Sequence, residues 1–126
     1  MARMELQSPF TITRWDEKST DGTEPQFGRV QVDKTYTGVM DGTSTAELTT
    51  CQPVEGSAGY VAIEKFRGTL EGRSGAFAFQ HGATISPAGP DFYGRIIPGS
   101  GTGELVGITG TVKLEHELIT LDYSLG

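Results

Sequence analysis

The residues of this chain best suited to acid–base chemistry are Glu64 and His81, which lie in two aromatic-rich segments, AGYVAIEKFRGTL (58–70) and SGAFAFQHGATI (74–85). A carboxylate beside an imidazole can move a proton or polarise a carbonyl group, and apolar surroundings raise the pKa of a carboxyl toward neutrality. We therefore expect Glu64 and His81 to be the catalytic residues, provided that the fold brings them together.

These two segments predict a β-hairpin that turns through EGRS (71–74). The register expected for it places three pairs opposite each other: Phe66 with Phe79, Gly68 with Phe77, and Glu64 with His81. Because side chains alternate along a strand, one face of the hairpin carries the acid–base pair together with an aromatic surface. We expect that surface to bind a ligand through Tyr60, Phe66, Phe77 and Phe79.

Other interpretations of the polar residues stay open at this point. A cross-strand Glu–His pair is also a common structural hydrogen bond. His116, between two glutamates, is typical of a solvated hairpin tip. Two distant histidines and one cysteine do not make a metal site, and the glycine-rich stretch PGSGTGEL (98–105) lacks the lysine and the helix of a phosphate-binding loop. We therefore expect no metal and no cofactor.

The elements that must position these residues are short strands. Apolar and polar residues alternate in PFTITRWDE (9–17) and GRVQVDKTYTG (28–38), and no window shows a sustained apolar stripe at helical spacing. Further strands are expected near 43–52, 91–97 and 102–107, and GTVKLEHELITLDYSL (110–125) predicts a hairpin that turns at His116–Glu117. The expected fold is all-β, a closed antiparallel β-barrel of about eight strands in a single domain that spans residues 1–126.

Three glycine repeats support a barrel. Segments beginning at Gly38, Gly68 and Gly103 each have a second glycine four positions later, followed after one residue by Ser or Thr. In each copy we expect the first glycine inside a strand, where it permits sharp coiling, and the second glycine in a tight turn. The repeats are therefore interpreted as architectural rather than functional.

Composition excludes several classes of partner. Sixteen acidic residues against ten Lys and Arg give a formal net charge of −6, which disfavours nucleic acid and anionic membrane surfaces. No apolar run is long enough to span a membrane. The opening MARMELQSPF lacks the apolar centre of a secretory signal, and the lone Cys51 cannot form an internal disulfide, so a cytoplasmic protein is expected.

Most of the chain from about Trp15 onward resembles a family of small bacterial proteins with a barrel like that of allene oxide cyclase and the dirigent proteins. The resemblance lies in AGYVAIEKFRGTLEGRSGAFAFQHGATI, IIPGSGTGELVGITGTVKLE and LDYSL, and its most specific parts are YVAIE, GRSGAFAFQH and GSGTGEL. It implies a closed barrel and no particular activity.

The positions that the resemblance marks as characteristic are Tyr60, Glu64, His81, Ser100 and Glu104. Ser100 and Glu104 are therefore added to the expected ligand-binding residues. Related sequences often carry His and Tyr where this chain has Glu117 and Ile119, which weakens any role for the last hairpin.

Two classes of function follow from these expectations. The first is a cofactor-independent isomerase or cyclase that holds a small, largely apolar substrate in the lumen of the barrel, where proximity and orientation supply much of the catalysis. The second is a non-catalytic carrier that uses the same lumen for a small hydrophobic molecule. Because a carrier has less need of an ionisable pair, the first class is favoured. Outward-facing Val and Ile side chains are compatible with side-to-side pairing into a homo-oligomer.

Overall fold

The computed structural model of the protein describes residues 3–19 and 26–126, and these form nine β-strands and no helix. The strands are β1 (Met4–Ser19), β2 (Gln26–Tyr36), β3 (Met40–Val54), β4 (Ser57–Leu70), β5 (Arg73–Ser86), β6 (Gly89–Ile96), β7 (Thr102–Gly103), β8 (Ile108–Glu115) and β9 (Leu118–Leu125). The expected all-β class is confirmed. The strand expected at 102–107 is shorter than predicted, because β7 ends at Gly103 and a turn occupies 104–107.

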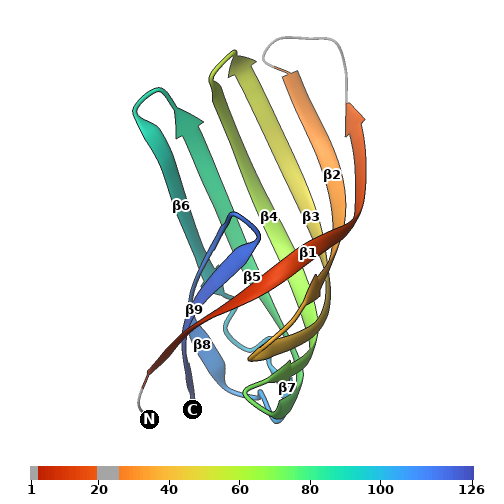
Figure 1. Ribbon diagram of the computed structural model, residues 1–126, viewed down its shortest axis with the longest axis vertical. Coiled ribbons are helices and arrows are strands. Elements are labelled where there is room, and N and C mark those ends of the chain that lie inside the picture. Colours follow the sequence, from red (N-terminus) through yellow and green to blue (C-terminus); the bar gives the residue numbers. More distant parts are fainter. Residues whose placement is uncertain (1–2, 20–25) are drawn as a thin grey trace.

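Eight of these strands pair in a ring. Along the sheet the order is β4-β3-β2-β1-β9-β8-β6-β5, every pairing is antiparallel, and a further pairing of β4 with β5 joins the two ends. The two-residue strand β7 adds to β5. We call the end with the turns at 55–56 and 87–88, at the top of Figure 1, the upper end, and the end with the turns at 38–39 and 71–72 the lower end. The β8–β9 turn at 116–117 lies about midway between them in this view.

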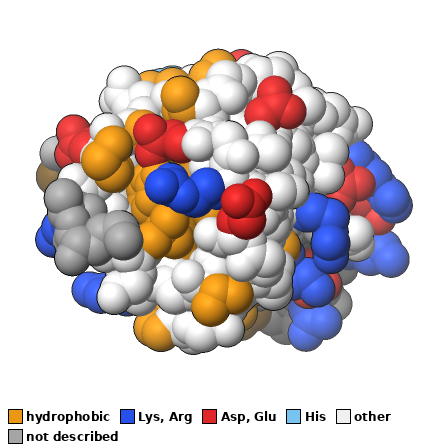
Figure 2. Space-filling view, turned by 90° about the horizontal axis from the view of Figure 1, so that it is seen from below, with side chains coloured by type: hydrophobic (Ala, Val, Ile, Leu, Met, Phe, Trp, Pro, Cys, Tyr) orange, Lys and Arg blue, Asp and Glu red, His pale blue; other side chains and the backbone are white. Residues whose placement is uncertain are grey.

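The lower half of the ring is filled by an apolar core. Alternate residues of β4, from Ala62 to Phe66, are buried and their neighbours are exposed, as expected for strands with one face inward. The largest fully buried apolar side chains are Tyr36, Met40, Phe66, Leu70, Phe77, Phe79, Ile96, Leu105, Ile108, Ile119, Leu121 and Tyr123. Seen from below, the described side chains cover this end of the molecule (Figure 2). Side chains therefore close the ring at its lower end.

Two glycines of the repeats meet across neighbouring strands. Gly42 of β3 pairs with Gly68 of β4, and a Cβ built on either would lie 2.1–2.2 Å from a carbonyl oxygen of the other strand. Gly68 confirms the expected place of a first repeat glycine inside a strand. The first copy reverses the expectation, because Gly38 lies in the β2–β3 turn and Gly42 lies inside the strand. Close approach of two backbones, rather than a turn, explains Gly42.

The β4–β5 hairpin differs from the predicted register by two residues. Its turn consists of Glu71 and Gly72, both with positive φ (50° and 81°), and Leu70 faces Arg73. Glu64 therefore faces Phe79 instead of His81, and His81 faces Ala62. Since a shift of two residues leaves each side chain on its original face, Glu64 and His81 remain on the inside of the ring as diagonal neighbours.

Candidate functional site

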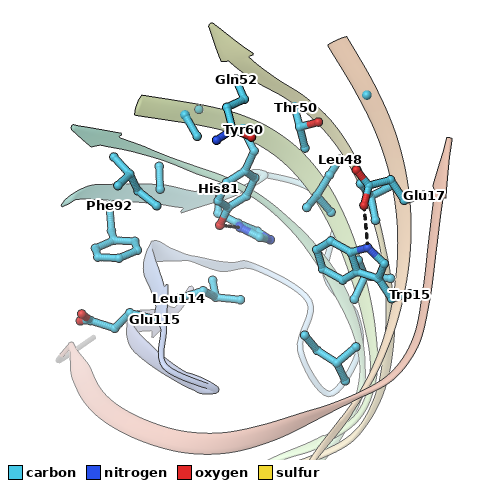
Figure 3. Close-up of a pocket in the computed structure, with 18 of the residues that line it drawn as sticks. Trp15, Glu17, Leu48, Thr50, Gln52, Tyr60, His81, Phe92, Leu114 and Glu115 are labelled. Atoms are coloured by element: carbon cyan, nitrogen blue, oxygen red, sulfur yellow. Dashed lines mark hydrogen bonds between the residues drawn. The ribbon is translucent and has the colours of Figure 1, made fainter. Parts of the chain in front are cut away.

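The upper half of the ring surrounds a cavity of about 570 Å³ that is partly open to solvent. This volume lies within the usual range for small-molecule sites, about 300–1,000 Å³. Most of the wall is apolar and includes Val30, Val32, Leu48, Ala83, Phe92 and Leu114. Polar side chains also line it, among them Tyr60, His81, Thr50 and Gln52 (Figure 3). Apolar walls with placed polar groups are typical of small-molecule sites.

A β-bulge in β1 adds an aromatic side chain to this wall. Ile12 faces Lys34 and Arg14 faces Asp33, so that Thr13 is the extra residue. The extra residue shifts the alternation of side chains, and Trp15 and Glu17 both line the cavity. The Trp15 indole Nε1 donates a hydrogen bond of 3.1 Å to Glu17 Oε1 (Figure 3). The indole ring is thereby held at the cavity with its polar edge satisfied.

Glu64 is the centre of a buried polar cluster in the middle of the ring. Its side chain is fully buried, and each carboxylate oxygen accepts two hydrogen bonds. Lys34 Nζ (2.8 Å) and His81 Nε2 (2.9 Å) bond Oε1, whereas Tyr36 (2.7 Å) and Ser44 (2.6 Å) bond Oε2 through their hydroxyl groups. No buried side-chain nitrogen or oxygen of the described residues lacks a partner. The cluster is therefore compatible with a stable core.

His81 connects this cluster to the cavity. Its Nε2 faces an ionised carboxylate, which only accepts, so Nε2 carries a hydrogen. In the neutral ring Nδ1 is then an acceptor, and the Tyr60 hydroxyl donates to it over 3.0 Å. In the protonated ring Nδ1 donates to the Tyr60 oxygen, and the phenolic hydrogen is free to point into the cavity. The pair can thus take up a proton from the cavity or deliver one.

The environment lowers the pKa of Glu64 rather than raising it. Burial alone raises this pKa, but the hydrogen bond from His81 and the positive charge of Lys34 outweigh burial and bring it to about 2. The expectation of a carboxyl with a near-neutral pKa is therefore wrong, because it considered the apolar surroundings without the cationic partner. Glu64 is therefore ionised at neutral pH. Burial, together with the Glu64 charge, raises the pKa of Tyr60 to about 12.

The lowered pKa of Glu64 predicts a loss of stability in acid. The pKa of Glu64 falls from 4.5 in the unfolded chain to about 2 in the fold. The ionised Glu64 therefore stabilises the fold fully above pH 4.5, and this stabilisation is lost as the pH falls toward 2. A difference of this size corresponds to about 3 kcal/mol of unfolding free energy. Urea unfolding between pH 6 and pH 2 checks it, with the uncharged double variant Glu64→Gln/Lys34→Met as the control. Parallel losses in the parent and the double variant would contradict the prediction.

The family of the chain follows from comparison with known proteins. A family model described as "Protein of unknown function (DUF3224)" matches residues 6–125. The chain belongs to the DUF3224 family. The crystal structure of a DUF3224 protein of unknown function from Shewanella oneidensis MR-1 is similar to it, with a TM-score of 0.87, 28% sequence identity, and coverage of 99% of this chain and 98% of that chain. No curated protein matches the chain significantly.

In this DUF3224 fold the expected ligand-binding residues separate into three groups. Tyr60 lines the cavity next to His81. The phenylalanines lie lower, in the packed core: the rings of Phe66 and Phe77 are 5.5 Å apart, and Phe79 follows at 5.7 Å from Phe77. Phe79 also lies 5.7 Å from the His81 ring. The phenylalanines therefore form a packed floor beneath the polar cluster, and not a wall of the cavity.

Ser100 and Glu104 lie apart from the cluster, at the lower end. The Ser100 hydroxyl accepts a hydrogen bond from the Ala78 amide and donates one to the Ala78 carbonyl oxygen. Glu104 Oε1 accepts a hydrogen bond from the Ser74 amide over 2.9 Å. Both side chains attach the segment around β7 to β5. The structure gives them a bracing role and does not bring them to the cavity.

Three cluster residues were absent from the sequence-based set: Lys34, Tyr36 and Ser44. The signal that could have found two of them is the alternation of β2, since Lys34 and Tyr36 are in phase with the inward-facing Val30 and Val32.

The last hairpin also contributes more than its sequence suggested, because residues 114–117 line the cavity. In the part of the chain that the structure describes, no group of His, Cys, Asp and Glu could hold a metal ion. No described helix is long and apolar enough to cross a membrane.

Proposed function

We propose that this DUF3224 protein is a cofactor-independent isomerase or cyclase that acts on a small, largely apolar molecule in the upper cavity. One observation carries the proposal: a continuous hydrogen-bonded path runs from the Tyr60 hydroxyl at the cavity wall through His81 to the buried carboxylate of Glu64. The apolar wall would hold the substrate in a reactive shape, and the path would move its proton.

The chemistry of this path needs no external reactant. With His81 neutral, the Tyr60 oxygen takes a proton from the substrate while its own phenolic proton passes to Nδ1. The negative Glu64 stabilises the imidazolium that forms. Reversal of the path returns the proton to a different substrate atom, which completes an isomerisation or accompanies ring closure. The catalytic roles thus fall to Tyr60 and His81, and Glu64 positions and stabilises His81.

The proposal extends to the architecture. We infer that the ring of eight strands is a closed barrel of the type found in allene oxide cyclase. Its support is the closing β4–β5 pairing, which runs from Ala58–Ile85 to Leu70–Arg73, together with glycines inside strands where backbones approach. In such a barrel, one packed end and one hollow end leave a single entrance for the substrate.

A carrier of small hydrophobic molecules is the second candidate. One feature of the site favours it: every hydrogen bond of Glu64 is made within the protein, so the cluster would be stable without any substrate. A carrier would use the apolar wall for affinity and would not need proton movement. The two candidates therefore differ in their dependence on the Tyr60 hydroxyl.

Replacement of Tyr60 by phenylalanine separates the two candidates. The variant keeps the ring and removes the hydroxyl, so the affinity for a compound extracted from the purified protein should change only a few-fold, whereas its turnover should fall by about 10²–10⁴-fold. Thr49→Val, which removes a hydroxyl at an exposed position of β3, is the control and should behave like the parent. Mass spectrometry of the extracted compound before and after incubation gives the readout. Binding without turnover in the parent would favour the carrier instead.

A further inference from the structure

The least satisfied charged group of the site is the ammonium of Lys34. Its side chain is only 7% exposed, yet a single protein oxygen, Glu64 Oε1, accepts a hydrogen bond from it. The ammonium also lies 4.5 Å from the centre of the Phe10 ring. An ammonium has three N–H donors, so two of them meet no acceptor among the residues that the structure describes. A buried ammonium with two unpaired N–H donors can donate hydrogen bonds to a ligand.

The place of Lys34 identifies where that acceptor would come from. Lys34 is one of the residues that line the upper cavity, and Glu64 Oε1 binds both Lys34 and His81. The unused donors and the Tyr60–His81 pair therefore belong to the same end of the cavity. Lys34 and Tyr60 are thus two polar groups on the wall of one cavity.

The charge of the site decides which kind of oxygen fits. The ionised Glu64 already balances the Lys34 ammonium, so a ligand carboxylate would bury a second negative charge without a second cation. Three carboxylates, from Glu17, Glu115 and Glu117, also line the cavity, and Glu17 and Glu115 lie on opposite walls (Figure 3). They disfavour the entry of an anion. A neutral oxygen acceptor meets neither penalty.

We infer that Lys34 is the group that binds and polarises a carbonyl oxygen, and that the ligand is a neutral carbonyl compound with a hydrocarbon body. The inference rests on the proposed function and assigns its substrate class. The Lys34 N–H donors would hold the carbonyl oxygen and stabilise negative charge that develops on it. A C–H bond next to the carbonyl then becomes acidic enough for the Tyr60–His81 path to take its proton. The electron pair of that bond enters the enolate, and the proton returns at another atom.

Three matched probes test the inference: 2-acetylnaphthalene, the oxygen-free 2-ethylnaphthalene, and the anion 2-naphthoate. In the parent protein the ketone should bind at least about tenfold more tightly than the hydrocarbon, because a hydrogen bond to a charged donor is worth more than a neutral one. It should also bind more tightly than the anion. The infrared carbonyl stretch of the bound ketone should lie below its frequency in an alkane solvent.

Variants separate the role of Lys34 from a general effect on folding. Lys34→Met alone leaves Glu64 buried without its cation, so the double variant Lys34→Met/Glu64→Gln is used, with its melting curve as a check that it folds. In the double variant the preference for the ketone over the hydrocarbon should disappear. Lys65→Met, at an exposed position of β4, should keep that preference.

The outcomes distinguish this inference from the proposed function. Equal binding of ketone and hydrocarbon by the parent would overturn the role of Lys34 and leave ligand binding in the cavity intact. Tighter binding of 2-naphthoate than of the ketone would overturn the neutral substrate class. If none of the three probes binds, both the inference and the proposed function fail.

Discussion

Replacing Glu64 by glutamine is expected to destabilise the fold by about 3–5 kcal/mol, the usual cost of removing one partner from a buried ion pair. The carboxylate accepts hydrogen bonds from four side chains, and its removal leaves the Lys34 ammonium buried without an opposite charge. The variant should therefore not be used alone to assign a catalytic role.

Guanidinium unfolding at neutral pH measures this effect. Glu47→Gln, at an exposed position of β3, is the control and should stay within about 0.5 kcal/mol of the parent. The double variant Glu64→Gln/Lys34→Met should be more stable than Glu64→Gln, because it leaves no unpaired charge in the core. A Glu64→Gln protein as stable as the parent would show that the cluster is not the buried ion pair described here.

Gly68→Ala is expected to have an effect of similar size for a different reason. The added Cβ would lie 2.1 Å from the carbonyl oxygen of Asp41 and 2.7 Å from the Cα of Gly42, so β3 and β4 could not keep their spacing. Gly68 also has a φ of 156°, which side chains disfavour. Overpacking and backbone strain together should cost about 3–5 kcal/mol, or roughly 10–20 °C in Tm.

Gly72→Ala is the matched control for Gly68→Ala. Gly72 also has positive φ (81°), but no described atom lies within 4 Å of the position of its Cβ. Gly72→Ala should therefore cost only the free energy of placing an alanine at positive φ, about 1 kcal/mol. Thermal unfolding of both variants by circular dichroism compares them directly. Equal losses of Tm would show that conformational preference, and not the close approach of β3 and β4, explains the glycine at position 68.

Much of the fold could be predicted from local patterns. Alternation of apolar and polar residues identifies most of the strands, and the turn at His116–Glu117 is confirmed by the positive φ of both residues. The β4–β5 register could not be fixed in the same way, since it depends on whether Glu71–Gly72 or Gly72–Arg73 forms the turn. Both choices place glycine in the turn, and only the whole ring distinguishes them.

The site could be predicted only in part. Glu64 and His81 were accessible because they lie on adjacent strands of one hairpin, where spacing along the sequence carries information. Lys34 lies on β2, and β3 separates it from Glu64 on β4, so its contact depends on the curvature of the ring. That contact reverses the direction in which the pKa of Glu64 shifts. Partners across a curved sheet thus decide the chemistry of a buried carboxyl.

Our main proposal is that the upper cavity holds a small, largely apolar molecule against Tyr60 and His81. Its most direct test is a high-resolution crystal structure of the protein purified from its own host, examined for electron density inside the ring. We expect elongated density along Val30, Leu48 and Phe92, with a polar atom within hydrogen-bonding distance of the Tyr60 hydroxyl. A cavity that contains only water, or one filled by inward movement of the surrounding side chains, would contradict it.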